Sequence, residues 1–193
     1  MIRAIIYDCF GVLTADRWLE FTATLPVDVS RAVRETHRAY DKGLVTYEDF
    51  RDQTAELANV QPSQVDDIFQ KHAGHTKNQE LLEHIARLKK NYKIGIISNV
   101  GTAWIREQFL TTDEQALFDD MVLSFEVGLS KPDPLIYELT CQRLNVLPQE
   151  VVFIDDLQSY CHAAEAVGMQ VIQYQGFSQY KEAIEVLLAN PDK

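Results

Sequence analysis

The sequence is short of cysteine and of basic residues, and it lacks a long uninterrupted apolar run. Its three cysteines, Cys9, Cys141 and Cys161, are odd in number and lack the spacing of metal ligands, so we expect no disulfide framework and a reducing compartment. Lys and Arg number 18 against 29 Asp and Glu, a net charge of −11 that argues against binding to nucleic acid or an anionic membrane. No apolar stretch approaches the ~20 residues of a membrane helix, and no signal peptide is visible. We therefore expect a cytoplasmic protein that binds neither nucleic acid nor membrane.

The composition is that of a globular protein. The chain has 193 residues, of which 46% are hydrophobic and 24% charged, enough for one large domain or one domain with a small insert. Short continuous runs rich in Ile and Val predict buried parallel strands at 4–7, 94–97, 151–154 and 170–172, with a weaker candidate at 121–124. Helical periods separate them, at 80–90, 102–110, 135–144, 159–167 and 179–188. This alternation predicts an α/β fold, a doubly wound parallel sheet with helices on both faces.

One segment departs from the alternation of strand and helix. From about residue 17 to about residue 74 the pattern is helical and contains no convincing strand. Thr46 and Ser63 both resemble helix starts, because an acid follows each hydroxyl three residues later. We therefore expect a small α-helical insert after the first strand, at residues 16–75, on a core formed by residues 1–15 and 76–193.

Polar side chains follow several of the predicted strands. Asp8 comes after the predicted strand at 4–7, and Ser98 and Asn99 come after the one at 94–97. Asp155 and Asp156 come after the one at 151–154. Lys131 lies in a loop beyond the weak strand. Because ligands of open parallel sheets bind at the carboxyl ends of the strands, we expect these side chains to share one site.

The residue types in this group suit phosphoryl transfer. Asp8 can act as a nucleophile that forms an acyl-phosphate. Ser98 and its neighbouring amides can donate hydrogen bonds to phosphoryl oxygens, and Lys131 can neutralise the charge on the phosphoryl group and on Asp8. Three crowded carboxylates, from Asp8, Asp155 and Asp156, would repel one another unless a cation lay among them. Oxygen ligands without His or Cys favour Mg²⁺.

In this order and at these strand ends, the segments resemble the four motifs of the haloacid dehalogenase-like (HAD) hydrolase superfamily, and the helical insert resembles its small cap. The resemblance extends from Ile5 to Gly168 and includes the run Gly128 to Pro134. It implies a phosphatase-like member in which Asp8 is the nucleophile and Mg²⁺ is held by the Asp8 carboxylate, the Phe10 carbonyl oxygen, and Asp155 and Asp156 directly or through water. It also implies that Ser98, Asn99 and Lys131 hold the phosphoryl group.

Phe10 departs from the phosphatase pattern. Phosphatases of this superfamily usually carry a second Asp two residues after the nucleophile, which protonates the leaving group. General acid catalysis contributes ~10²–10⁴-fold, so its loss would matter most for a poor alkoxide leaving group. An aromatic residue here resembles the 2-haloacid dehalogenases, which need no metal and usually lack a full acidic pair in the last motif. Asp16 or a residue of the helical insert is an alternative proton donor that the spacing does not establish.

The pair Asp155 and Asp156 favours an Mg²⁺-dependent hydrolase of small phosphate monoesters, such as sugar phosphates, that works through an aspartyl-phosphate on Asp8. Two alternatives stay open at this point: a 2-haloacid dehalogenase-type hydrolase in which Asp8 attacks carbon, and a catalytically weak binding protein. The expected partner is a small phosphorylated metabolite, and the chain is expected to be a monomer or a small homo-oligomer.

Overall fold

The computed structural model describes residues 1–70 and 76–189, and at its centre is a five-stranded parallel sheet. The strand order is β3-β2-β1-β4-β5. The strands are β1 (Ala4–Tyr7), β2 (Lys93–Ser98), β3 (Asp120–Leu123), β4 (Val151–Asp155) and β5 (Gln170–Gln173). The four strands predicted from apolar runs are confirmed, and the weaker candidate at 121–124 is β3.

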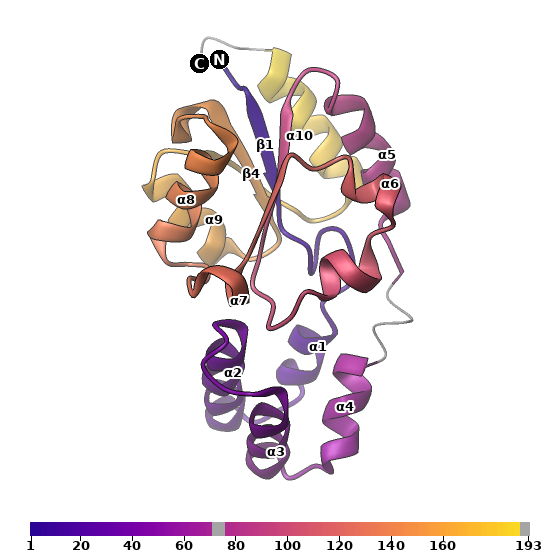
Figure 1. Cartoon of the computed structure of the whole chain (residues 1–193), viewed down its shortest axis with the longest axis vertical. Coiled ribbons are helices and arrows are strands. Elements are labelled where there is room, and N and C mark those ends of the chain that lie inside the picture. Colours follow the sequence, from indigo (N-terminus) through magenta and orange to yellow (C-terminus); the bar gives the residue numbers. More distant parts are fainter. Residues whose placement is uncertain (71–75, 190–193) are drawn as a thin grey trace.

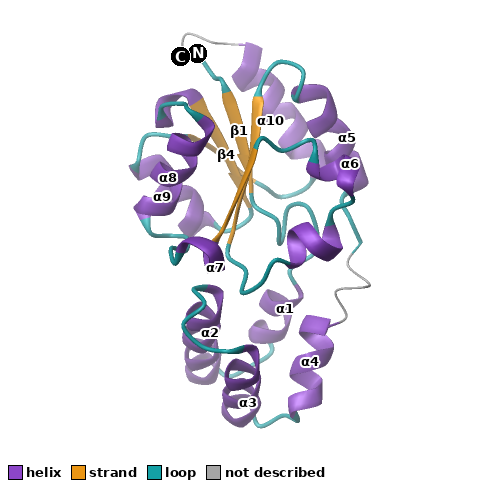
Figure 2. Ribbon diagram, viewed as in Figure 1, coloured by secondary structure: helices purple, strands orange, loops and turns teal. Residues whose placement is uncertain are grey.

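The first strand of the chain lies in the middle of the sheet. Ile5 of β1 pairs with Ile94 of β2 on one side and with Val152 of β4 on the other. All four residues of β1 are buried, because both faces of the sheet are covered by helices (Figure 2). Because β1 is the central strand, the residues that follow its carboxyl end lie at the middle of one edge of the sheet.

Successive residues of β1 point to opposite faces of the sheet and so enter two different cores. Ile5 and Tyr7 pack in the cluster that contains α5 (Gln79–Leu88) and α10 (Phe177–Ala189). Ala4 and Ile6 pack in the cluster that contains α8 (Pro134–Leu144) and α9 (Gln158–Ala166). Figure 1 shows these two helix pairs on either side of the sheet. The predicted doubly wound α/β fold is confirmed.

Short helical segments complete the connections between strands. They are η2 (Ile105–Phe109), α6 (Thr112–Gln115), α7 (Ser124–Val127) and η3 (Pro148–Glu150). The segment 102–110, predicted as a regular helix, instead forms the π-helical turn η2, in which the Leu110 amide donates to the Ile105 carbonyl. This wider turn buries Trp104, Ile105, Phe109 and Leu110 together, and a 3.6-residue period read from the sequence does not anticipate it.

Four helices lie beyond the carboxyl ends of the strands, at the bottom of Figure 1. They are α1 (Arg17–Ala23), α2 (Val27–Asp41), α3 (Tyr47–Ala58) and α4 (Pro62–Gln70), and together we call them the helical layer. They have a small core of their own, formed by Tyr40, Phe50, Ala55 and Val65. As expected, the described residues from 17 to 70 contain no strand. The predicted boundary at residue 75 lies outside the described residues.

Cys9, Cys141 and Cys161 are buried free thiols, so the expected absence of disulfides is confirmed. Within residues 1–70 and 76–189, the helices are too short or too polar to cross a bilayer.

Candidate active site

Asp8 follows β1 directly, at the carboxyl end of that strand, and lines a cavity together with residues of the helical layer. Its Oδ1 accepts a hydrogen bond from the Cys9 amide at 2.6 Å, and the residue is only 6% exposed. The hydrogen bond from Cys9 and the ion pair with Lys131 both engage Oδ1. The side chain is therefore held by one oxygen, while the other remains available to attack an electrophile.

Lys131 bridges two carboxylates from different strands. Its Nζ lies 2.9 Å from Asp8 Oδ1 and 2.6 Å from Asp155 Oδ2, and the side chain is almost completely buried. Burial disfavours the charged amine, but Asp155 and Asp8 favour it more strongly, so the pKa of Lys131 is raised above its ordinary value. The lysine therefore stays cationic beside Asp8, as charge neutralisation requires. The predicted convergence of these residues, which are far apart in sequence, is present in the fold.

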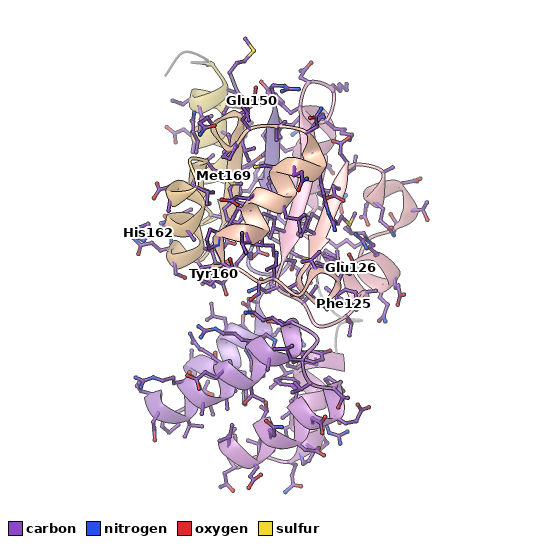
Figure 3. The ribbon with its side chains drawn as sticks, turned by 60° about the vertical axis from the view of Figure 1, so that its left-hand side comes forward. Phe125, Glu126, Glu150, Tyr160, His162 and Met169 are labelled. Carbon is purple, nitrogen blue, oxygen red and sulfur yellow. The ribbon has the colours of Figure 1, made fainter. Side chains whose placement is uncertain are left out.

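Asn99 holds the backbone of Lys131 on both sides. Its Oδ1 accepts from the Lys131 amide at 2.8 Å, and its Nδ2 donates to the Lys131 carbonyl at 3.0 Å. Nδ2 also donates to the Tyr160 hydroxyl at 3.3 Å, and Figure 3 shows Tyr160 at the end of the α/β part nearest the helical layer. Asn99 was predicted to bind substrate, but its amide atoms are already engaged. This geometry supports a role in positioning Lys131, and direct substrate contact stays a prediction.

Asp8, Asp155 and Asp156 form a cluster in which one oxygen of each lies within 4.8 Å of the others. Burial raises the pKa of Asp8 well above its ordinary value; Lys131 acts in the opposite direction, and the charges of Asp155 and Asp156 add to the effect of burial. Burial and the charge of Asp155 raise the pKa of Asp156 to about 6. A divalent cation among these oxygens would relieve the repulsion, and an all-oxygen donor set suits Mg²⁺. The residues present therefore fit a magnesium ion.

Asp155 and Asp156 differ in how their carboxylate oxygens are engaged by other protein groups. Asp155 Oδ2 is paired with Lys131, and its Oδ1 accepts from the Leu157 amide at 2.9 Å. Asp156, by contrast, lines the open cavity beside Asp8. The geometry favours Asp156 as the direct carboxylate ligand, with Asp155 acting chiefly through Lys131.

Gly11 is required by the position of Asp156. Its φ of +83° is in the region that favours glycine, and a Cβ at this residue would overlap the Asp156 carboxylate. The absence of a side chain therefore lets the backbone of the loop after Asp8 approach the Asp156 carboxylate. Only the fold reveals this requirement, since the sequence does not show which residue Gly11 faces.

Ser98 ends β2 and is completely buried. Its Oγ has no hydrogen-bond partner among the described residues. An unsatisfied buried hydroxyl is costly, and a bound phosphoryl oxygen is a partner that would satisfy it. The predicted role of Ser98 as a phosphoryl ligand is therefore supported by its orphaned donor.

Phe10 places an apolar ring at the position where related phosphatases usually carry a second Asp. The ring stacks on Trp104 with centroids 5.7 Å apart and planes inclined by 16°. Trp104 in turn stacks on Phe109, at 4.9 Å. Phe10 therefore lines the cavity without a group that can donate a proton.

A cavity of about 300 Å³ opens between the sheet edge and the helical layer. The α/β part contributes predicted site residues to its wall: Asp8, Phe10, Asn99, Lys131 and Asp156. Ser98 and Asp155 are completely buried and are not among the residues that line the cavity. The helical layer contributes residues that the sequence did not assign to the site: Trp18, Arg34, His37, Tyr40 and Asp41. Their helical spacing is the same as that of core residues, so no local signal marks them as cavity residues.

Comparison with known proteins agrees with this geometry. Residues 32–174 match the family model described as haloacid dehalogenase-like hydrolase. The D-ribitol-5-phosphate phosphatase of Bacteroides thetaiotaomicron is 23% identical over 205 residues, which cover 97% of this chain and 99% of that protein.

Two solved structures share the fold. One is a HAD family enzyme of Bacteroides thetaiotaomicron in complex with magnesium and inorganic phosphate, with a TM-score of 0.66, 22% identity, and coverage of 91% of this chain and 95% of that one. The other is the L-2-haloacid dehalogenase of Xanthobacter autotrophicus, with a TM-score of 0.67, 20% identity, and coverage of 97% and 83%. Because the family model matches most of the chain and the strand-end residues converge as that fold requires, this protein belongs to the haloacid dehalogenase-like hydrolases.

Proposed function

We propose that this chain is an Mg²⁺-dependent hydrolase of small phosphate monoesters, sugar phosphates among them. The observation that carries the proposal is the contact of Lys131 with both Asp8 and Asp155, with Asp156 adjacent. The similarity to a sugar-alcohol phosphate phosphatase supports the substrate class, and a cavity of about 300 Å³ suits a small metabolite.

The proposed mechanism assigns a role to each residue of the sheet edge. Asp8 Oδ2 attacks phosphorus and forms an aspartyl-phosphate, which water then hydrolyses. Lys131 and Ser98 hold the phosphoryl oxygens, and Asn99 keeps Lys131 in place. Mg²⁺, when bound by Asp8, the Phe10 carbonyl and Asp156, neutralises the charge of the phosphoryl group.

We further propose that residues 16–75 are a cap that closes over the core of residues 1–15 and 76–193. The helical layer forms one wall of the cavity, so its side chains are placed to select the substrate and exclude water. The chain is expected to act as a monomer or a small homo-oligomer.

Phosphate release from p-nitrophenyl phosphate and a panel of sugar phosphates, with Mg²⁺ and with chelator, tests this function. Asp8→Asn should abolish the Mg²⁺-dependent activity, whereas Asp133→Asn, which changes the N-terminal cap of α8 outside the cavity, should retain it. Activity of Asp8→Asn equal to that of the parent would overturn the nucleophile assignment.

Phe10 favours a second candidate, carbon–halogen hydrolysis by Asp8, because halide departs without a proton. Chloride release from a 2-chloro acid in the presence of chelator would support this candidate over the phosphatase. Mg²⁺ and phosphate binding without turnover of any substrate would instead indicate a catalytically weak binding protein.

A further inference from the structure

The proposed phosphatase needs a proton for its leaving group, and Phe10 cannot supply one. For an alkyl phosphate, the oxygen released when the phosphorus–oxygen bond breaks is a strongly basic alkoxide. A positioned acid typically accelerates such a step by ~10²–10⁴-fold. The donor must therefore be sought among the other side chains of the cavity.

Asp41 is the carboxyl group in the helical layer that meets this need. It is the last residue of α2, lines the same cavity as Asp8 and Lys131, and is only 3% exposed. Its Oδ1 is buried and accepts no hydrogen bond from the described residues. A nearly buried carboxyl group with one oxygen that lacks a hydrogen-bond partner, on the cavity wall formed by the helical layer, is placed to interact with a bound substrate.

The surroundings of Asp41 favour its neutral, proton-carrying form. Burial, and to a smaller extent the charge of Asp16 on α1, raises the pKa of Asp41 to about 8, although Lys131 acts in the opposite direction. The carboxyl end of α2 also disfavours a negative charge at its last residue. A phosphate dianion in the cavity would disfavour ionisation further.

Neither His37 nor Tyr160 carries a positive charge that would stabilise the ionised form of Asp41. His37 Nε2 lies 3.5 Å from Asp41 Oδ1, but burial and the nearby Arg38 lower the pKa of His37 to about 3, so the imidazole is neutral. From the α/β part, Tyr160 also faces this region, and burial raises the pKa of its hydroxyl. No cation lies close enough to form an ion pair with Asp41 among the described residues.

The backbone of Asp41 is tied to the core. Its carbonyl accepts a hydrogen bond from Ser124 Oγ at 2.6 Å, and Ser124 Oγ accepts one from the Val100 amide at 2.8 Å. Val100 belongs to the loop after β2 that contains Asn99, and Phe125, next to Ser124, lies at the junction with the helical layer in Figure 3. The carboxyl group of Asp41 therefore has a defined place relative to Asp8.

Asp16 is the competing acid in the cavity. Its Oδ1 accepts the Leu19 amide at 2.8 Å as the N-terminal cap of α1. Burial raises the pKa of Asp16, and the hydrogen bond from the Leu19 amide acts in the opposite direction. Asp16 thus has a structural function that Asp41 lacks.

We propose that Asp41, and not Asp16, is the general acid and base of the phosphatase reaction proposed above. As Asp8 Oδ2 bonds to phosphorus and the ester bond breaks, the electron pair of that bond goes to the leaving oxygen, which takes the Asp41 proton and departs as an alcohol. The Asp41 carboxylate then accepts a proton from the water that attacks the aspartyl-phosphate. Inorganic phosphate, the Asp8 carboxylate and protonated Asp41 result.

Asp41→Asn, compared with the parent and with Asp16→Asn, tests the assignment on two substrates that differ in leaving group. With glycerol 1-phosphate, kcat/KM of Asp41→Asn, which reports the steps up to formation of the aspartyl-phosphate, should fall by ~10²–10⁴-fold. With p-nitrophenyl phosphate, whose leaving group needs no proton, kcat/KM should fall little, and this activity also verifies that the variant is folded. The parent's kcat for glycerol 1-phosphate should decline as pH rises past about 8, and the variant should lack this decline.

Equal losses of kcat/KM on both substrates would overturn the role of Asp41 as the general acid, as would the leaving-group-dependent loss appearing in Asp16→Asn instead. A parent without Mg²⁺-dependent activity on p-nitrophenyl phosphate would contradict the proposed function itself, which is a separate outcome.

Discussion

The side-chain amide of Asn99 and the main chain of Lys131 hold each other through two hydrogen bonds, of 2.8 and 3.0 Å. Lys131 in turn contacts Asp8 and Asp155. The loop after β2 therefore determines where the Lys131 side chain lies, although Asn99 and Lys131 are 32 positions apart in sequence.

This relationship predicts that Asn99→Ala lowers kcat with little change in KM. A displaced Lys131 would neutralise the phosphoryl charge less well, and misplacement of a catalytic group by about 1 Å can cost on the order of 10²-fold. Steady-state kinetics with p-nitrophenyl phosphate measure both constants. Tyr160→Phe is the matched control, because it removes only the 3.3 Å hydrogen bond to Asn99 and should change kcat far less. A raised KM at unchanged kcat would instead assign Asn99 to substrate binding.

Gly11→Ala should abolish Mg²⁺-dependent activity. The new methyl group would displace the Asp156 carboxylate, which we expect to bind the metal. Gly128→Ala is the control: its φ is +68°, but a Cβ there meets no atom within 4 Å. Both variants should lose about 1–2 kcal/mol of stability from the left-handed backbone conformation. Mg²⁺ titrations by calorimetry should show weakened binding only in Gly11→Ala; equal binding in both variants would contradict the metal assignment.

Phe10→Asp separates the two possible sources of the proton. If Asp41 supplies it, adding the usual acid should accelerate glycerol 1-phosphate hydrolysis little in the parent and strongly, by ~10²-fold or more, in Asp41→Asn. The double-mutant cycle compares kcat of the four proteins. A large acceleration in the parent would show that the native site works without an efficient acid.

The pH dependence of stability reports the protonation state of Asp41 without any substrate. With a pKa of about 8 in the folded protein and 3.8 as its ordinary value, Asp41 carries a proton in the folded chain and none in the unfolded chain between these pH values. Folding then takes up a proton, so Asp41 lowers the free energy of unfolding as pH rises, by up to about 1.4 kcal/mol per pH unit.

His37 has the opposite effect below pH 6.5, because its pKa falls to about 3 on folding. The difference between Asp41→Asn and the parent isolates Asp41, and urea unfolding should show the variant gaining relative stability from pH 5 to pH 8. A difference that is constant with pH would mean that Asp41 is ionised in the folded protein.

The sequence predicted the parts of the site that depend on local pattern. Strands β1, β2 and β4 are short apolar runs, and parallel strands place the residues at their carboxyl ends at one edge, so the sequence alone brings Asp8, Ser98 and Asp155 to that edge. Lys131 followed from its place beyond the weakest strand. The N-terminal cap of α8, with Asp133 followed by Pro134, was equally local.

The parts that depend on contacts between distant segments were not predictable. The overlap that makes Gly11 necessary arises where the loop after β1 meets Asp156, 145 positions away in sequence. Asn99 was assigned to substrate because its hydrogen bonds to Lys131 are invisible in the sequence. Asp41 and His37 lie one turn apart on α2, a spacing shared by many surface pairs, and only the cavity distinguishes them.

The covalent intermediate tests the central claim most directly. The protein is mixed with a sugar phosphate and Mg²⁺, quenched in acid within one turnover, and digested for mass spectrometry. The account predicts a phosphoryl group on the peptide that contains Asp8, and its absence in Asp8→Asn. Full turnover with a phosphoryl group on another residue, or with no phosphorylated peptide at any time, would contradict it.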